Sequence, residues 1–232
     1  MKTIGLLGGM SWESSIEYYR IINEEVRHRL GGTHSARSVM YSVDFHEIEE
    51  MQHRGDWEAA TRAMIDGARS VEAAGAECLV ICTNTMHLMA DDVQKAIDIP
   101  LLHIADATAD AVDAAGIGTV ALLGTHFTME HHFYRGRLEQ RHALEVLIPD
   151  DDDRTIVHDI IYDELVRGVV EDDSRAAYLS IIDSLISDGA EGVIAGCTEI
   201  ELLVTPDDVD IPYFPTTRIH AMAAVDWALT SI

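Results

Sequence analysis

Hydrophobic positions along the chain form two alternating kinds of segment. Short, nearly continuous apolar runs predict buried strands at residues 2–8, 38–43, 77–82, 101–104, 119–124, 144–149, 191–196 and 212–215. Longer segments lie between them and predict amphipathic helices, at residues 11–30, 56–75, 153–168 and 174–189. Strands that alternate with helices indicate parallel β–α–β units. Strands that are apolar on both faces are typical of a parallel sheet covered by helices on both sides.

The ends of the predicted helices carry local signals. Ser11 is suited to cap the first helix, with Ser14 in its first turn, and Gly75 is suited to end the second. The acidic run DDDDR, residues 150–154, is interpreted as a solvated turn between elements. These signals place the polar segments outside the predicted core.

The order of the elements repeats once along the chain. GLLGG and ECLVICTNT in the first half have counterparts ALLGT and GVIAGCTEI in the second. The repeat pairs Gly8 with Gly124, Cys82 or Thr83 with Cys197, and Pro100 with Pro212. We therefore expect an α/β fold of two pseudosymmetric lobes, each a parallel-type sheet flanked by helices, with the active site in the cleft between lobes. The expected lobes are residues 1–100, completed by a C-terminal helix at about 216–230, and residues 101–213.

Small polar residues follow four of the predicted strands, in GGMS, CTNT, GTHFT and GCTE. Ligands of open parallel sheets bind outside the carboxyl ends of the strands. Backbone N–H groups at the start of a following helix favour an anion there. The pattern predicts a small anionic ligand that carries a carboxylate.

The charge balance excludes some classes of protein. The chain has 41 acidic and 16 basic residues, for a formal net charge of −25. A nucleic-acid binder needs a basic face for phosphates, so we expect no nucleic-acid partner. An acidic surface repels itself when salt is low, which favours the hypothesis of a high-salt cytoplasm.

Localisation is inferred from cysteines and apolar runs. The three cysteines, Cys78, Cys82 and Cys197, are too few for a disulfide framework and indicate a reduced setting. No apolar run approaches the roughly 20 residues of a membrane span, and no signal peptide is recognised. We expect a cytoplasmic protein with no membrane partner.

Several motifs have two interpretations each. GLLGGMS departs from dinucleotide and P-loop spacing, so it is either a tight β–α turn or a carboxylate cradle. Cys197 is either a buried structural thiol or a thiol whose pKa is lowered at a helix N-terminus. Cys78 lies inside a strand run and is predicted to be core. Histidines at 126, 131 and 132 lack metal-site spacing, so no metal is expected.

Six motifs together resemble a known family. GLLGGMSWESS, YSVDFHEIEE, CTNTMH, HIADAT, ALLGT with TMEHHFYRGRL, and GCTEIELLV run in order through essentially the whole chain. They resemble the aspartate/glutamate racemases of the Asp/Glu/hydantoin racemase group, and especially its bacterial broad-specificity amino-acid racemase branch. The resemblance implies a homodimeric isomerase that needs no PLP or other cofactor. It also implies an amino-acid substrate and two opposed acid/base residues, one for each face of the α-carbon.

One position departs from the family pattern. The family motif has cysteine directly before Asn-Thr, where this chain has Thr83, and Cys82 comes one residue earlier. Neighbouring residues of a strand point to opposite sides, so Cys82 should pack away from the site. The predicted catalytic pair is therefore Thr83 and Cys197. A threonine hydroxyl is a poor base, so Cys197 is expected to accept the α-proton and, by resemblance, to face the L-enantiomer.

The predicted substrate contacts follow from the resemblance and the strand ends. They are Met10, Gln52, Asn84, Thr85, Thr125, Glu164, Thr198 and Glu199. Asn84 and Thr85 are expected to hold the α-carboxylate. Glu164 stands where the aspartate-selective branch favours a base, which favours neutral or polar substrates such as homoserine over aspartate. Glu199 either orients Cys197 or is an exposed acid favoured by a helix dipole.

Two other functions remain open. An arylmalonate decarboxylase-like enzyme would need only Cys197 as proton donor, and release of CO₂ from a malonate would identify it. A non-catalytic amino-acid-binding protein would bind its ligand without exchange of the α-proton. The racemase interpretation is favoured because Cys197 and the rest of the motif set are present.

Overall fold

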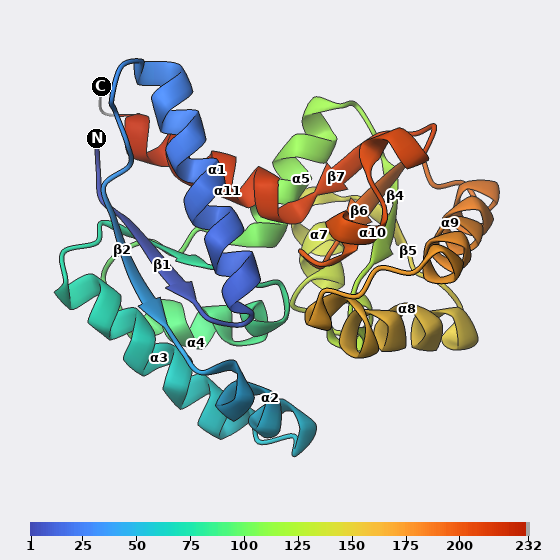
Figure 1. Ribbon diagram of the computed structural model, residues 1–232, viewed down its shortest axis with the longest axis horizontal. Coiled ribbons are helices and arrows are strands. Elements are labelled where there is room, and N and C mark those ends of the chain that lie inside the picture. Colours follow the sequence, from blue (N-terminus) through green and yellow to red (C-terminus); the bar gives the residue numbers. More distant parts are fainter. Residues whose placement is uncertain (231–232) are drawn as a thin grey trace. The chain divides into compact units, whose positions relative to one another are not determined.

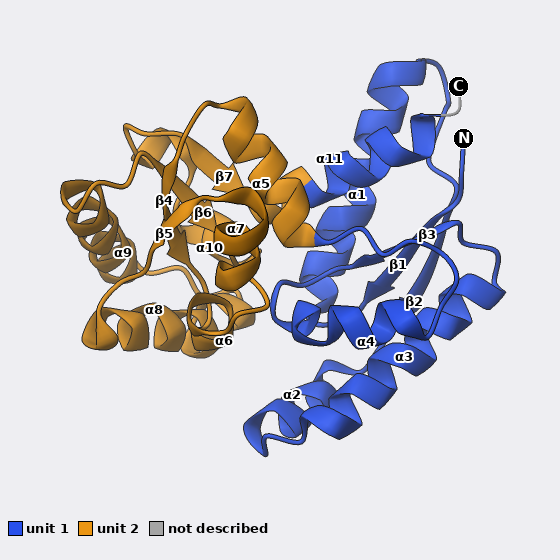
Figure 2. Cartoon of the chain, turned by 180° about the vertical axis from the view of Figure 1, so that it is seen from behind, with its two compact units in different colours: residues 1–103, 220–232 blue, residues 104–219 orange. Residues whose placement is uncertain are grey.

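The chain forms two compact α/β units in a computed structural model that describes residues 1–230 (Figure 1). Unit 1 comprises Met1–His103 and His220–Ile232, and unit 2 comprises Ile104–Ile219 (Figure 2). Each unit has its own parallel sheet and its own apolar core.

Unit 1 is built on a sheet of three parallel strands in the order β2-β1-β3. Its elements are β1 (Ile4–Gly8), α1 (Trp12–Leu30), β2 (Ser38–Ser42), α2 (Phe45–His53), α3 (Trp57–Ala73), β3 (Cys78–Ile81), the 3₁₀ helix η1 (Thr85–Met89), α4 (Ala90–Lys95) and most of α11 (Thr216–Leu229). The central strand β1 is buried along its whole length.

Alternation along the strands of unit 1 divides the core between the two faces of the sheet. Leu6 and Cys82 belong to a cluster formed with α1 and α11. Leu7 and Ile81 belong to a second cluster, formed with α2, α3 and α4. The prediction that Cys82 packs away is confirmed, because its side chain is fully buried in the first cluster.

Unit 2 is built on a sheet of four parallel strands in the order β5-β4-β6-β7. Its elements are α5 (Ile104–Ala114), β4 (Thr119–Leu123), α6 (His126–Glu130), α7 (Arg135–His142), β5 (Glu145–Leu147), α8 (Asp151–Asp163), η2 (Leu165–Arg167), α9 (Asp172–Ser187), β6 (Gly192–Ala195), α10 (Ile200–Leu203), η3 (Pro206–Asp208) and β7 (Tyr213–Pro215). One cluster contains residues of α8 and α9, and the other contains residues of α5 and α7.

The two units repeat one topology, which confirms the predicted fold class of two related α/β lobes. In each unit the first strand is flanked by the second on one side and the third on the other. The Pro100 carbonyl accepts a hydrogen bond from the N–H of Leu79 at 2.8 Å, and the Pro212 carbonyl accepts one from Val193 at the same distance. The proline pairing inferred from the sequence therefore has a counterpart in the hydrogen bonds.

Two local predictions are wrong. The strand expected at 101–104 is a single bridge between Leu79 and Leu101, because the chain turns directly into α5 at Ile104. The acidic run at 150–154 is the start of α8 and not a turn. Asp150 caps that helix by accepting the N–H of Asp153 at 3.0 Å, and the helix dipole favours acids in the first turn.

Other helix signals are confirmed. The Ser11 hydroxyl accepts the N–H of Ser14 at the start of α1. Gly75 follows the end of α3 with a φ of +94°, a conformation that favours glycine. Among the helices of residues 1–230, none combines the length and the apolar character that crossing a membrane requires.

Candidate functional site

The glycine turn after β1 is tightly packed in unit 1. Gly9 has a φ of +95°, and a Cβ there would lie 2.3 Å from the Val43 carbonyl oxygen. The Gly9 N–H donates to the Ser15 hydroxyl at 2.8 Å, and that hydroxyl in turn donates to the Ser11 carbonyl at 2.9 Å. These contacts support the tight-turn interpretation of GLLGGMS, since the Gly9 N–H is already bonded within the protein.

The turn after β3 lies beside the glycine turn, because β1 and β3 are neighbours in the sheet. The Cys82 N–H donates to the Leu7 carbonyl at 2.9 Å and continues this pairing. Thr83 is half-buried, whereas Asn84 and Thr85 are buried. Burial raises the pKa of Cys82, which keeps that thiol protonated at neutral pH. Thr83 is the next residue and carries the first half-exposed polar side chain of the turn.

A group of three buried histidines, His87, His103 and His220, supports this turn. His87 Nδ1 is 2.8 Å from the Thr83 carbonyl oxygen, so Nδ1 carries the proton and donates it. The His87 ring lies 4.7 Å from that of His103 and 5.6 Å from that of His220, measured between centroids. Burial, and then the two other histidines, lower the pKa of His87 well below its ordinary value.

His220 is held in one tautomer. Its Nε2 donates to the Leu102 carbonyl at 2.8 Å, so its Nδ1 accepts from the Tyr18 hydroxyl at 2.8 Å. Burial lowers the pKa of His220 to about 4. Sequence reasoning missed this group. The one available signal was the spacing of four residues between Thr83 and His87, which allows the His87 ring to donate a hydrogen bond to the Thr83 carbonyl.

Gln52 lies in α2 and is almost fully buried. Its Nε2 is 3.2 Å from the Met86 sulfur, which is only a weak acceptor. Its Oε1 has no hydrogen-bond partner among the residues that the structure describes. Met10 belongs to the same apolar cluster as Met86 and is 5% exposed, which leaves mainly its backbone to meet a ligand.

The corresponding turns of unit 2 follow β4 and β6. A Cβ on Gly124 would lie 3.0 Å from the Gly196 carbonyl oxygen, so the two strand ends approach closely. Their proximity places Thr125 and Cys197 on adjacent strand ends. The Thr125 hydroxyl caps α6 by accepting the N–H of Thr128 at 3.4 Å. Thr198 accepts a hydrogen bond from Thr217 at 2.9 Å.

Cys197 is paired with an acid. Its half-buried thiol donates to Glu199 Oε2 at 3.0 Å. Burial, and then the Glu199 charge, raise the pKa of Cys197 well above its ordinary value. The alternative of a pKa lowered by a helix N-terminus is wrong, because α10 has only four residues and the Glu199 carboxylate opposes a thiolate. Glu199 is only 9% exposed, so the alternative of an exposed acid is also wrong.

Glu164 lies at the end of α8, where its Oε2 accepts from the Ser174 hydroxyl at 2.6 Å. The pKa of the buried Tyr178 is raised by burial and then by Cys197, with a smaller contribution from Glu164. Two predicted site residues, Cys197 and Glu164, therefore both act on the pKa of Tyr178. Its hydroxyl donates to the Val157 carbonyl at 2.9 Å. Sequence reasoning missed Tyr178, which has the appearance of an ordinary core residue of α9.

Histidines after β4 form ring contacts and ion pairs. His126 Nδ1 is 3.0 Å from Glu130, and the His126 ring lies 4.4 Å from that of His158. Within residues 1–230, no group of three or more His, Cys, Asp or Glu side chains is arranged to hold a metal ion.

Comparison with known proteins assigns the fold and these turns to a family. The Asp/Glu/hydantoin racemase family model matches residues 7–224. The chain is 54% identical to a Yersinia pestis protein provisionally named an Asp/Glu racemase, whose crystal structure superposes with a TM-score of 0.94 over 99% of this chain and 100% of that one. It is 34% identical to an aspartate racemase homologue from Pyrococcus horikoshii, with a TM-score of 0.85 over 98% and 99% of the two chains.

A curated relative is also an amino-acid racemase. The chain is 21% identical to the broad-specificity amino-acid racemase RacX of Bacillus subtilis over 231 residues, 96% of each protein. The family match spans both units and includes the turns that carry Thr83 and Cys197. By its sequence and by its two related parallel sheets, the chain belongs to the Asp/Glu/hydantoin racemase family.

Proposed function

We propose that the protein is a PLP-independent amino-acid racemase in which Cys197 and Thr83 act on opposite faces of the α-carbon. The observation that carries the proposal is the hydrogen bond from the Cys197 thiol to the Glu199 carboxylate at 3.0 Å. A buried carboxylate beside a thiol gives the thiol proton a place to go when a thiolate is needed. Membership of the racemase family supports the same assignment.

The proton transfers follow from the resting state of this pair. The raised pKa of Cys197 keeps it as a thiol at neutral pH. To act as a base, Cys197 first passes its proton to Glu199, and the thiolate then takes the α-proton of the L-amino acid. The Thr83 hydroxyl returns a proton to the opposite face. It is replenished from solvent as Glu199 gives up the proton that it accepted, so the site returns to its starting state.

The equilibrium between the enantiomers limits how far the enzyme can favour one direction of the reaction. L- and D-enantiomers have equal free energies in water, so kcat/KM is the same in the two directions. A weak base at Thr83 must therefore appear as a difference in kcat and KM together. A Thr83→Cys substitution restores the thiol of the family motif, and we expect it to accelerate exchange from the D-enantiomer.

The proposed substrate contacts favour polar amino acids. Asn84 and Thr85 would hold the α-carboxylate. The backbone at Met10, in the glycine turn, and the Thr125 and Thr198 side chains are the further proposed contacts. Gln52 and Glu164 would meet the side chain. An amide with an unpartnered oxygen and a carboxylate suit a hydroxyl-bearing side chain such as that of homoserine better than a second carboxylate. Aspartate and glutamate remain in the tested range because of the family.

The test is exchange of the α-proton in D₂O with a panel of L- and D-amino acids that includes homoserine, aspartate and glutamate. Proton NMR follows the α-signal, and chiral chromatography follows the configuration. We expect wild type to exchange with inversion and Cys197→Ala to lose exchange. Cys82→Ala is the matched control, because Cys82 is buried in the core of unit 1 and should be dispensable for exchange.

A second substitution separates the two bases. Thr83→Val removes the hydroxyl and keeps the shape of the side chain. We expect this variant to exchange the α-proton of the L-amino acid with retention and to form little D-product. Full inversion in Thr83→Val would remove Thr83 from the proposal.

A catalytic pair with Cys197 as its one thiol also suits a decarboxylase of the arylmalonate type, which would need only Cys197. If no amino acid exchanges, malonates are tested next, and release of CO₂ would establish that reaction. Tight binding of an amino acid with neither reaction would indicate a non-catalytic binding protein.

A further inference from the structure

His87 completes the hydrogen bonding of the turn that carries Thr83. Its backbone N–H donates to the Asn84 carbonyl at 3.0 Å, three residues back, which is the pattern of a 3₁₀ helix. In an α-helix the same N–H would donate to the Thr83 carbonyl, four residues back. The ring supplies that carbonyl with a donor instead, because Nδ1 of His87 lies 2.8 Å from the Thr83 oxygen. His87 therefore binds the turn at two points.

These bonds limit how Thr83 can rotate. Before Thr83, the pairing with β1 continues as far as the Cys82 N–H, which donates to the Leu7 carbonyl at 2.9 Å. After Thr83, the bond from His87 fixes the direction of the Thr83 carbonyl and of the planar peptide unit to which it belongs. The direction in which the Thr83 side chain leaves the backbone follows from the peptide units on its two sides. The His87 bond therefore helps to aim the Thr83 hydroxyl.

Two other buried histidines flank the His87 ring. The His103 ring is tilted by 60° to it with the centroids 4.7 Å apart, and the His220 ring by 63° with the centroids 5.6 Å apart. Burial, and then these two histidines, lower the pKa of His87 well below its ordinary value, so His87 is uncharged at neutral pH. A neutral imidazole has one N–H, and the bond to Thr83 places it on Nδ1. His87 is therefore a donor of fixed tautomer.

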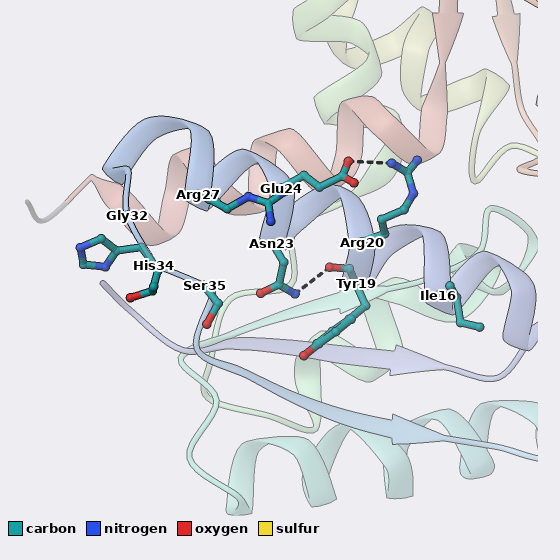
Figure 3. A pocket seen from close by; sticks show the side chains of 10 residues that line it. Ile16, Tyr19, Arg20, Asn23, Glu24, Arg27, Gly32, His34 and Ser35 are labelled. Atoms are coloured by element: carbon teal, nitrogen blue, oxygen red, sulfur yellow. Dashed lines mark hydrogen bonds and ion pairs between the residues drawn. The ribbon is translucent and has the colours of Figure 1, made fainter.

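Helix α1 fixes His220 through one of two adjacent tyrosines. Tyr18 is fully buried and donates its hydroxyl to His220 Nδ1 at 2.8 Å, while His220 Nε2 donates to the Leu102 carbonyl at 2.8 Å. Both ring nitrogens of His220 are therefore bonded. Tyr19, the next residue, is 52% exposed and lines a cavity of about 600 Å³ on the solvent side of α1 (Figure 3). The two hydroxyls thus form a matched pair, with only that of Tyr18 bonded to His220.

We propose that His87 is a positioning residue for the Thr83 hydroxyl, and that His220, fixed by Tyr18, holds the His87 ring in place. The inference rests on the proposed racemase function and deepens it, because none of these three residues is among the proposed substrate contacts. It predicts a selective defect. Loss of the His87 bond should impair proton transfer by Thr83 and spare removal of the α-proton by Cys197.

The readout is the face on which the α-carbon is reprotonated. An L-amino acid is incubated in D₂O, where Cys197 removes the α-proton. Return of deuterium from Cys197 gives deuterated L-amino acid, and delivery from Thr83 gives deuterated D-amino acid. Chiral chromatography with mass spectrometry measures the ratio of the two at early times. Because this choice is made within the bound complex, the ratio does not depend on substrate affinity or on the fraction of enzyme that is folded.

Two substitutions of His87 separate its hydrogen bond from its bulk. His87→Leu removes the donor, and we expect the ratio of deuterated L- to deuterated D-amino acid to rise about tenfold or more, since a displacement of about 1 Å can cost about 100-fold in rate. His87→Asn should return the ratio most of the way to that of wild type, because the amide nitrogen can replace Nδ1 as the donor to the Thr83 carbonyl.

The tyrosine pair tests the part assigned to His220. Tyr18→Phe removes the hydroxyl that binds His220 Nδ1 and should raise the ratio in the same direction as His87→Leu, by a smaller factor. Tyr19→Phe is the matched control and should leave the ratio as in wild type, because the Tyr19 side chain lies in the cavity on the solvent side of α1 (Figure 3).

A further control separates positioning from general stability. Val71 is fully buried, and a Cβ on Gly5, near the start of β1, would lie 2.3 Å from its Cγ1. Val71→Ala should therefore destabilise unit 1 at the end of the sheet away from the Thr83 turn. We expect its urea midpoint to fall and its ratio of products to equal that of wild type.

The outcomes separate this inference from the proposed function. A wild-type ratio in His87→Leu, or an equally raised ratio in His87→Asn and Val71→Ala, would overturn the role of His87, and a wild-type ratio in Tyr18→Phe would overturn the role of His220. A wild type that exchanges no α-proton would overturn the proposed function instead. Hydrogen exchange of the amide of residue 87, followed by NMR, then decides the role of His87. Its protection should fall in His87→Leu and recover in His87→Asn, and equal protection in wild type and both variants would overturn the inference.

Discussion

At the scale of single residues, Cys82 and Cys197 differ in what surrounds them. Both follow an apolar strand at a polar turn. Cys82 is fully buried in an apolar cluster, whereas the thiol of Cys197 has a carboxylate 3.0 Å away and is half-buried. Burial keeps both thiols protonated at neutral pH. Of the two, Cys197 has a carboxylate that could receive its proton, and the proposed mechanism uses Glu199 in that role.

The Glu199→Gln variant tests that relationship. Removing the charge should lower the pKa of Cys197, although burial will still hold it above the ordinary value. Each unit by which the pKa of Cys197 falls raises its thiolate fraction at neutral pH about tenfold. Alkylation of Cys197 by iodoacetamide at neutral pH should therefore accelerate. Exchange of the substrate α-proton should slow, because the carboxylate that receives the thiol proton is lost.

Cys78 and Cys82 should react little with iodoacetamide. Both side chains are fully buried, whereas Cys197 is half-buried, and burial raises the pKa of Cys78 to about 12 and also raises that of Cys82. Cys197→Ala therefore provides the blank. An alkylation rate that is equal in wild type and Glu199→Gln would show that Glu199 does not control the thiol.

His220 should make the protein sensitive to acid. Its pKa is about 4 in the folded chain and about 6.5 when unfolded, so the unfolded chain binds more protons between these values. The free energy of unfolding should therefore fall as the pH drops from about 6.5 to about 4, by up to about 3 kcal/mol from this residue. Urea unfolding at a series of pH values measures the slope.

Two variants test whether His220 causes this slope. His220→Asn should flatten the dependence of the free energy of unfolding on pH between 4 and 6.5, since an amide can keep both hydrogen bonds without titrating. A histidine on the surface provides the control. His28→Asn should leave the slope as in wild type, because the His28 side chain is 81% exposed. An unchanged slope in His220→Asn would show that another group titrates in this window.

At the scale of elements, the start of α8 shows how a charge run acquires a structural role. Four consecutive aspartates, Asp150–Asp153, begin this helix, and only the first of them caps it. The next three lie in the first turn, where the dipole of the helix favours negative charge. Repulsion between neighbouring acids acts against this, and burial followed by Asp150 and Asp152 raises the pKa of Asp153.

Substitution of the cap separates these contributions. Asp150→Ala should reduce the free energy of unfolding by about 1 kcal/mol, because the N–H of Asp153 loses its acceptor. Asp152→Ala removes the same charge without removing a cap and should change stability by less. Thermal or urea unfolding of the two variants measures the difference. Equal losses would mean that charge and not capping sets the stability of this helix start.

At the scale of the whole molecule, net charge governs how stability responds to salt. With 41 acids and 16 bases, the folded chain concentrates like charge that the unfolded chain spreads out. We expect potassium chloride to raise the melting temperature from low to high concentration. An uncharged osmolyte at matched osmolality should have a smaller effect at the low end. A melting temperature that is unchanged or higher in low salt would refute the high-salt hypothesis.

The sequence by itself determined the order of strands and helices, the repeated α/β arrangement and the family. It also distinguished Cys82 from Thr83. These properties rest on local periodicity and on motifs of contiguous residues, which can be recognised without knowing distant contacts. The sequence did not predict that residues 101–104 form only a single bridge or that a helix begins after Asp150. The local sequence signals are weak at both places, and packing against neighbouring elements decides the structure there.

Only the tertiary structure decided the state of the titratable groups. The raised pKa of Cys197, the burial of Glu199 and the lowered pKa of His87 all depend on what surrounds each side chain. Tyr18 and His220, for example, are 202 residues apart in sequence and 2.8 Å apart in space. The free energy of a charge depends on burial and on nearby groups, and folding brings those together from distant parts of the chain.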